Sequence, residues 1–222
     1  MNCNELENVY WKNYILIEKE FKSTLAYVYL SEDNFETYSN EYIKLILQIG
    51  SEIDVVLKSF CQYIDNSFNK NKMPEYIKFI KNNYQNLIVQ RVKLRNSDIN
   101  FNPWNEVVVN EEDVPSWWTI YNKVKHERNS VITVNNISKI SYKFANLKNV
   151  LYSLGALYQI LLNYYLNQAK KENRKLLIPL PGSRIFVLSG DEWTDINFVL
   201  DQFFYVDYND GTLHSICGNF EY

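Results

Sequence analysis

The chain has 222 residues, 46% of them hydrophobic, which suits one large domain or one domain with an appendage. Its formal net charge of −3 excludes binding of nucleic acid through overall charge, so contact with RNA or DNA needs a local basic patch. The three cysteines are scattered and lack CxxC spacing, which favours a reducing compartment. The N-terminus is polar, and no apolar run approaches the length of about 20 residues that crosses a bilayer. The sequence therefore predicts a cytoplasmic protein with no membrane segment.

Apolar residues recur at three- and four-residue steps through much of the chain, which indicates amphipathic helices. The first predicted helices cover 5–29, 37–66 and 74–83. Gly50 interrupts the second helix at a cost of about 1 kcal/mol, and it permits close packing of another helix. Residues 84–114 give no clear pattern, and Leu87-Ile88-Val89 starts either a strand or an irregular segment.

Two further helices are predicted in the second half of the chain. The acidic run Glu111-Glu112-Asp113 before Pro115 and Ser116 favours a helix start, so we expect a helix over 115–129. The longest apolar stripe predicts a helix over 141–171.

The pattern changes after residue 173. Residues 176–178 and 184–188 are typical of short strands, and Asn209-Asp210-Gly211 is a hairpin turn signal before 212–216. The sequence therefore predicts a mainly α fold. A helical domain covers 1–172, and a small β-rich C-terminal appendage covers 173–222.

The segment Ser116–Asn129 has the richest chemical content. It holds one of only two histidines, His126, beside a tryptophan pair and among three cations. Asn122 and His126 are four residues apart, so on a helix they share one face. Tyr121, Lys125 and Arg128 form the neighbouring face. A histidine flanked by cations suits the handling of a phosphodiester.

A six-residue segment before the final long helix resembles the signature of the HEPN superfamily. This segment is Tyr121-Asn122-Lys123-Val124-Lys125-His126. That signature is Arg, a polar residue, three variable residues and His. Asn122 and His126 match its polar and His positions, and Tyr121 stands where the family has Arg. Glu52 and Asp54 near Lys58 are similar to the acidic residue and Lys of many HEPN-like proteins. The resemblance covers about 5–170.

The resemblance implies a HEPN-like helical bundle that acts as a metal-independent endoribonuclease or RNA-binding protein, without a cofactor. It also implies bacterial phage defence or toxin–antitoxin function, with RNA and a second copy or a partner protein of a defence system as partners. In that chemistry the ribose 2′-OH attacks the adjacent phosphate and leaves a 2′,3′-cyclic phosphate.

The same resemblance gives roles to individual residues. His126 would shuttle a proton, and Asn122 would orient it or bond a phosphate oxygen. Lys125 or Arg128 would supply the positive charge that the family takes from Arg. Tyr121, Glu52 and Trp117 are the candidate supporting residues.

Structural interpretations stand beside each of these roles. His126 near a helix C-terminus can bond a carbonyl oxygen, and Lys125 and Arg128 can form a solvated face. Trp117 and Trp118 are either core residues or, if exposed, base-stacking residues. His214 and Cys217 are two ligands short of a zinc site, so no metal is expected. The alternative function is a non-catalytic protein-interaction module of a defence complex.

Overall fold

The computed structural model describes all residues except 96, 111–112, 175, 190–192, 194–203, 207–212 and 216–222, and it gives only the backbone of 204–206 and 213–215. The described chain is mainly helical, which confirms the predicted fold class. Its α-helices are α1 Cys3–Leu6, α2 Lys12–Thr24, α3 Asn40–Ile64, α4 Met73–Asn83, α5 Asn86–Val89, α6 Asn105–Val109, α7 Ser116–His126 and α8 Leu147–Lys171.

Short strands among the described residues form small antiparallel sheets, in the orders β2-β1-β5, β3-β4 and β6-β7. The strands are β1 Arg91–Leu94, β2 Asn100–Phe101, β3 Val131–Val134, β4 Ile137–Ile140, β5 Phe186–Ser189, β6 Phe204–Val206 and β7 Leu213–Ser215. Within the described ranges, no helix has both the length and the apolar character needed to cross a bilayer.

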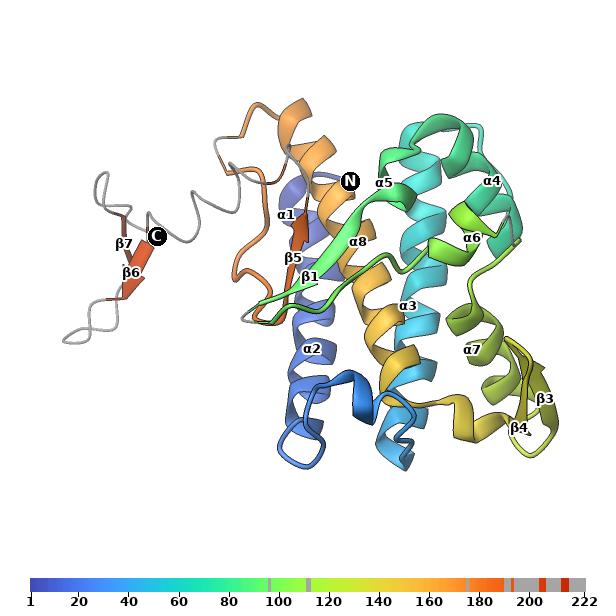
Figure 1. Cartoon of the computed structure of the whole chain (residues 1–222). Coiled ribbons are helices and arrows are strands. Elements are labelled where there is room, and N and C mark those ends of the chain that lie inside the picture. The colour runs from blue at the N-terminus through green and yellow to red at the C-terminus, as the bar shows by residue number, and fades with distance from the viewer. Residues whose placement is uncertain are drawn as a thin grey trace.

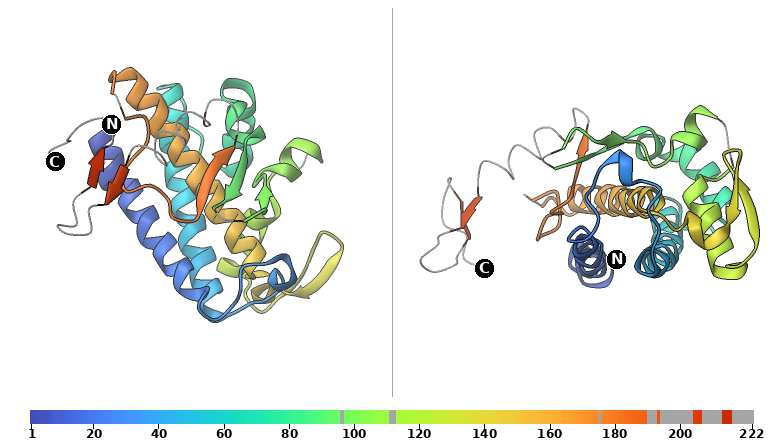
Figure 2. Two further views of the ribbon diagram at one scale, coloured as in Figure 1. Left: turned by 60° about the vertical axis from the view of Figure 1, so that its left-hand side comes forward. Right: turned by 60° about the horizontal axis from the view of Figure 1, so that its bottom comes forward.

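The long helices α2, α3 and α8 form the centre of the fold, and α7 packs against α3 and α8 (Figure 1). The right-hand view in Figure 2 shows α8 in the middle of the helical region, with α2 and α3 on one side of it and the β1–β2–β5 sheet on the other. A helix that is apolar on most sides belongs in the interior. This applies to α8, whose buried polar residues Gln159 and Asn163 bond to the side chain of Trp104 and to Gln90.

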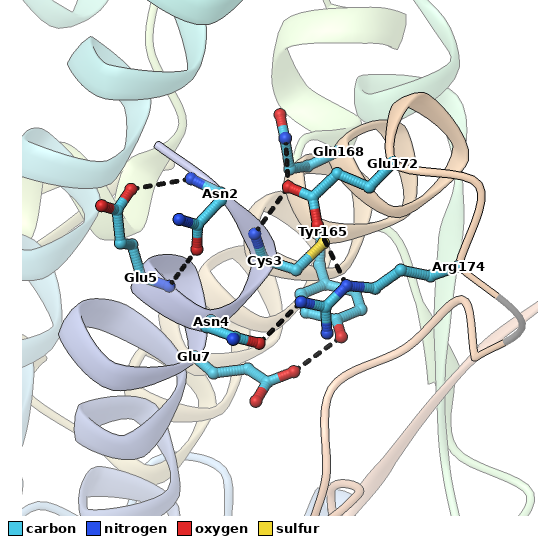
Figure 3. A network of polar contacts seen from close by, with 9 residues as sticks. All are labelled: Asn2, Cys3, Asn4, Glu5, Glu7, Tyr165, Gln168, Glu172 and Arg174. Carbon is cyan, nitrogen blue, oxygen red and sulfur yellow. Dashed lines mark hydrogen bonds and ion pairs between the residues drawn. The ribbon is translucent and has the colours of Figure 1, made fainter.

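The N-terminal helix is continuous from Cys3 to Thr24, because a π-helical stretch, Glu7–Trp11, joins α1 to α2. Its first turn is fixed to the end of α8 by a polar network (Figure 3). There the Glu172 carboxylate accepts the backbone N–H of Cys3 at 3.0 Å, and Arg174 donates to Glu172 at 3.0 Å and to Asn4 at 2.6 Å. These contacts hold the two ends of the helical region together.

The sheet brings together segments that are far apart in sequence. In β5, Leu188 pairs with Val92 of β1, and Phe186 is fully buried in the same core as the helices. The segment before β5 is fastened to α2 by buried Glu18. This carboxylate accepts bonds from the hydroxyl of Ser183 and from the backbone N–H of Ile185 at 3.2 Å.

Several local predictions differ from the structure. Residues 176–178 form no strand, and 87–89 lie in the short helix α5. Residues 141–144 form a 3₁₀ turn, and α8 starts after Asn146, whose side chain caps it. The β3–β4 hairpin was not predicted; Asn135 and Asn136 turn it, with φ of 50° and 64°. The Asn209-Asp210-Gly211 turn signal lies outside the described residues, between paired β6 and β7.

Candidate functional site

The motif helix α7 has clear local reasons for its start and its end. Glu106 accepts the backbone N–H and the hydroxyl of Ser116, which satisfies free donors at the helix start. The helix ends at His126, where the Glu127 N–H closes the last turn on the Lys123 carbonyl at 2.7 Å. The observed helix, Ser116–His126, is therefore shorter than the predicted helix over 115–129, and Arg128 lies beyond its end.

Tyr121 is a packing residue at the position where the HEPN family has Arg. Its side chain is only 4% exposed. A Cβ atom placed on Gly50 of α3 would lie 2.3 Å from Cδ2 of Tyr121, so the ring lies directly on the glycine backbone. The ring also contacts Trp118 at 4.9 Å between centroids. The first motif position thus joins α7 to α3.

One helical turn further along both helices, Lys125 of α7 and Asp54 of α3 line the same depression. Lys125 is exposed and donates to the Tyr121 hydroxyl at 3.2 Å. Burial raises the pKa of Asp54, and the positive charges of Lys125 and Lys58 offset only part of that rise. The carboxylate and the ammonium group are therefore close enough for their charges to influence each other.

These groups line an open depression of about 320 Å³. Its lining residues are Asp54, Asn71, Lys72, Met73, Pro74, Trp118, Tyr121, Asn122 and Lys125. Lys72 and Lys125 bring two cations to the depression, and Asp54 brings one carboxylate. This is a local basic site on an acidic chain, of the kind that contact with a phosphodiester requires.

Asn122 and His126 lie on one accessible face of α7. His126 is exposed, and its imidazole has no hydrogen-bond or ion-pair partner among the described residues. The amide nitrogen of half-buried Asn122 donates to the Trp118 carbonyl at 3.2 Å. The Asn122 oxygen, in contrast, bonds no described residue. This oxygen therefore remains available as a hydrogen-bond acceptor on the side of α7 that also carries His126.

The structure places three other candidate residues away from this face. Arg128 is exposed and lines a different depression, with Lys44 and Tyr142. Glu52 is half-buried, does not line the Asp54 depression and bonds no described residue. Trp117 is 2% exposed, packs at 5.3 Å from Trp104 and donates to the Pro103 carbonyl at 2.8 Å. Trp117 is therefore a core residue with no face for a base.

The sequence analysis named Asp54 beside Glu52 but chose Glu52 as the supporting residue, whereas Asp54 is the one that lines the depression. The signal was present in the spacing, because Asp54 follows Gly50 by four residues and Lys125 follows Tyr121 by four. Once Gly50 and Tyr121 are known to touch, the next turn of both helices brings Asp54 to Lys125. Only the contact between the two helices was missing from the sequence.

A metal site would need several His, Cys, Asp or Glu side chains close together. In the part of the chain that the structure describes, no three His, Cys, Asp or Glu side chains gather at one place that could hold a metal ion. Burial raises the pKa of Cys3 to about 11 and that of Cys61 to about 12. The His214 side chain and Cys217 lie outside the described residues.

Comparisons with protein-family models, with curated proteins and with solved structures give no match for this chain.

Proposed function

We propose that the protein is a metal-independent endoribonuclease with a HEPN-like bundle, and that His126 is its proton-transfer group. The observation that carries the proposal is the accessible face shared by Asn122 and His126, with Asn122 also lining the depression that holds Asp54 and Lys125. An exposed imidazole without a protein partner can reach a substrate and can act there as a general acid or base.

The proposed reaction is an internal transesterification of RNA. The ribose 2′-oxygen forms a bond to the adjacent phosphorus, and the bond from phosphorus to the 5′-oxygen of the next nucleotide breaks. The 2′-hydroxyl loses a proton and the leaving 5′-oxygen gains one. One imidazole can take or give a proton in this step, so the second transfer falls to water or to His126 of a second copy in a homodimer.

Lys125 is the cation assigned to the phosphate. Lys125 precedes His126 in the chain, and its ammonium group donates to the Tyr121 hydroxyl at 3.2 Å. An ammonium is a point charge without the planar fork of Arg, so we expect weaker stabilisation of the phosphate than the family's Arg gives. Lys72, across the depression, supplies a second charge for the RNA backbone.

The alternative function is a non-catalytic interaction module of a defence complex. The burial of Tyr121 at the position of the family's Arg favours this alternative, because it shows that one motif position has a packing role. The setting in phage defence or toxin–antitoxin function rests on the resemblance in both cases. A partner protein that co-purifies and blocks RNA cleavage supports the toxin form of the proposal.

An RNA cleavage assay in EDTA tests the proposal. The wild type, His126→Ala and Lys123→Ala are compared on tRNA, mRNA and phage RNA, and the product ends are analysed. Lys123 is the matched control, since it is a surface cation of the same helix that pairs with Glu127 at 2.9 Å. We expect cyclic phosphate ends from the wild type and Lys123→Ala only. Two results contradict the proposal that the protein is a ribonuclease acting through His126. One is cleavage by His126→Ala at the wild-type rate, and the other is no cleavage by any of the three folded proteins.

A further inference from the structure

A second cleft, of about 400 Å³, lies at the other end of α7. It is bounded by β2, the start of α7, the tip of the β3–β4 hairpin and the first turn of α8. It shares no lining residue with the Asp54 depression. Its volume falls in the range of roughly 300–1,000 Å³ that is usual for small-molecule sites.

One wall of this cleft is aromatic and rigid. The half-buried ring of Tyr152 stacks on Phe101 with centroids 4.4 Å apart and 22° between the planes. Phe101 in turn is pressed against α8 at Gly155, where an added Cβ would meet the ring at 2.9 Å. The Tyr152 hydroxyl bonds no described residue. The wall therefore presents a fixed aromatic surface with an available hydroxyl.

The cleft also carries two cations without acidic partners. Within the described ranges, neither Arg91 nor Lys148 forms an ion pair. Arg91 uses its Nε to bond the Asn100 side chain at 3.0 Å and one terminal nitrogen to bond the Asn100 carbonyl, so its other terminal nitrogen is available. A planar guanidinium of this kind suits phosphate oxygens.

Lys148 occupies a position that the helix itself disfavours. It is the second residue of α8, where the positive end of the helix dipole repels a cation. Its ammonium group bonds no described hydrogen-bond acceptor and lies 5.8 Å from the Tyr152 ring centre. The Tyr152 ring is thus the one partner of this ammonium group among the described residues. A bound anion would add the opposite charge that Lys148 lacks at this position.

The two carboxylates that line the cleft are already engaged. Glu36 pairs with Lys139 at 2.6 Å, and Glu106 accepts bonds from Ser116 and from the Asn135 amide at 3.1 Å. Glu36 is thus neutralised by Lys139, whereas Glu106 has only neutral donors, so the lining charges without an ion-pair partner among the described residues are Arg91, Lys148 and Glu106, with a sum of +1. The exposed side-chain amide of Asn105, which bonds no described residue, adds a donor and an acceptor to the rim.

We propose that this cleft binds a nucleoside monophosphate. The base lies along the Tyr152 wall and is read by the Asn105 amide, and the phosphate lies between Arg91 and Lys148. An aromatic surface, an amide and two unpaired cations are the groups that a base and a phosphate require together. The cleft and the α7 face have no lining residue in common, so this binding does not depend on ribonuclease activity.

Isothermal titration calorimetry with the full chain tests the proposal. The probes are AMP, GMP, CMP and UMP, with adenosine and inorganic phosphate as separate arms. We expect at least one monophosphate to bind at least tenfold more tightly than either separate arm. Failure of all four monophosphates to bind at millimolar concentration overturns the proposal. So does inorganic phosphate that binds as tightly as the best monophosphate, because the base then contributes nothing.

Variants assign the binding to this cleft. Lys148→Ala is expected to weaken the monophosphate about tenfold, as loss of one charge-assisted bond does, without lowering the melting temperature. Lys171→Ala removes the same charge at the far end of α8, roughly 35 Å away, and should leave binding unchanged. Arg91→Gln should act like Lys148→Ala. A monophosphate that binds Lys148→Ala and Arg91→Gln as tightly as the wild type overturns the assignment.

Discussion

Gly50 of α3 lies directly beneath the ring of Tyr121 of α7, with only 2.3 Å between the place of a glycine Cβ and the ring carbon Cδ2. This contact accounts for two unusual features of the sequence. It gives a packing reason for a glycine in the middle of a 25-residue helix. It also explains why position 121 holds an aromatic residue, since the ring is buried against the helix backbone.

Gly50→Ala should lower the free energy of unfolding by about 1–3 kcal/mol, because the added methyl group forces Tyr121 out of its place. The same change in an open helix would stabilise the protein by up to about 1 kcal/mol. Urea unfolding measures the difference. Ser51→Ala, at the exposed neighbouring position, should change stability by less than about 0.5 kcal/mol. An unchanged or higher stability of Gly50→Ala would mean that the two helices are not in this contact.

Tyr121 should act through its ring and not through its hydroxyl. We expect Tyr121→Ala to lower stability by about 3–5 kcal/mol, as for other large aromatic residues in a core. Tyr121→Phe keeps the ring and loses only the bond from Lys125, so its cost should be about 1 kcal/mol and RNA cleavage should continue. If Tyr121→Phe abolishes cleavage while it stays folded, the hydroxyl has a catalytic role that the proposed mechanism lacks.

Asp54→Asn should make the protein more stable at neutral pH. Burial raises the folded-state pKa of Asp54 above its ordinary value of 3.8. The contribution of Asp54 to the free energy of unfolding is therefore fully present below pH 3.8, and it is lost as the pH rises through the raised pKa. The stability gain of Asp54→Asn should therefore grow over that interval and then stay constant.

Asp65→Asn provides a control of opposite sign. Bonds from the hydroxyl and the backbone N–H of Ser67 lower the pKa of Asp65, so its contribution is present above pH 3.8 and is lost at lower pH. This variant should be less stable than the wild type at pH 7. The same sign for both variants in unfolding curves between pH 3 and pH 8 contradicts the assignment of Asp54.

Cys3 and Cys61 should resist alkylation in the folded protein at pH 8. Both are fully buried, and their raised pKa values, about 11 and about 12, leave very little reactive thiolate. Iodoacetamide treatment followed by peptide mass mapping should find both unmodified until denaturant is added. Rapid labelling of Cys61 in the native state would show that the α3 core opens.

Long helices were the part of the fold that the sequence predicted well. The apolar stripes of α3 and α8 are long enough that their 3.6-residue period identifies them without tertiary information. The β1–β5 pairing was not predictable, because Val92 and Leu188 come from segments nearly 100 residues apart. The β3–β4 hairpin was missed because Asn135-Asn136 is a weaker turn signal than a pair with glycine.

The candidate site was predictable only in part. The shared face of Asn122 and His126 follows from their spacing on one helix. Sequence alone could not show which neighbouring side chains face α3, and this decides that Tyr121 is buried while Lys125 is exposed. It likewise could not choose Asp54 over Glu52, since both lie on the same helix and only the packing of α7 distinguishes them.

The most direct test of the account is a paired measurement of RNA cleavage rate and melting temperature for His126→Ala. The imidazole is exposed and bonds no described residue, so stability should change by less than about 0.5 kcal/mol. Loss of a proton-transfer group should reduce the cleavage rate by about 10²-fold or more. A variant that cleaves RNA at the wild-type rate, or one that loses activity only because it melts at a much lower temperature, contradicts the assignment of His126.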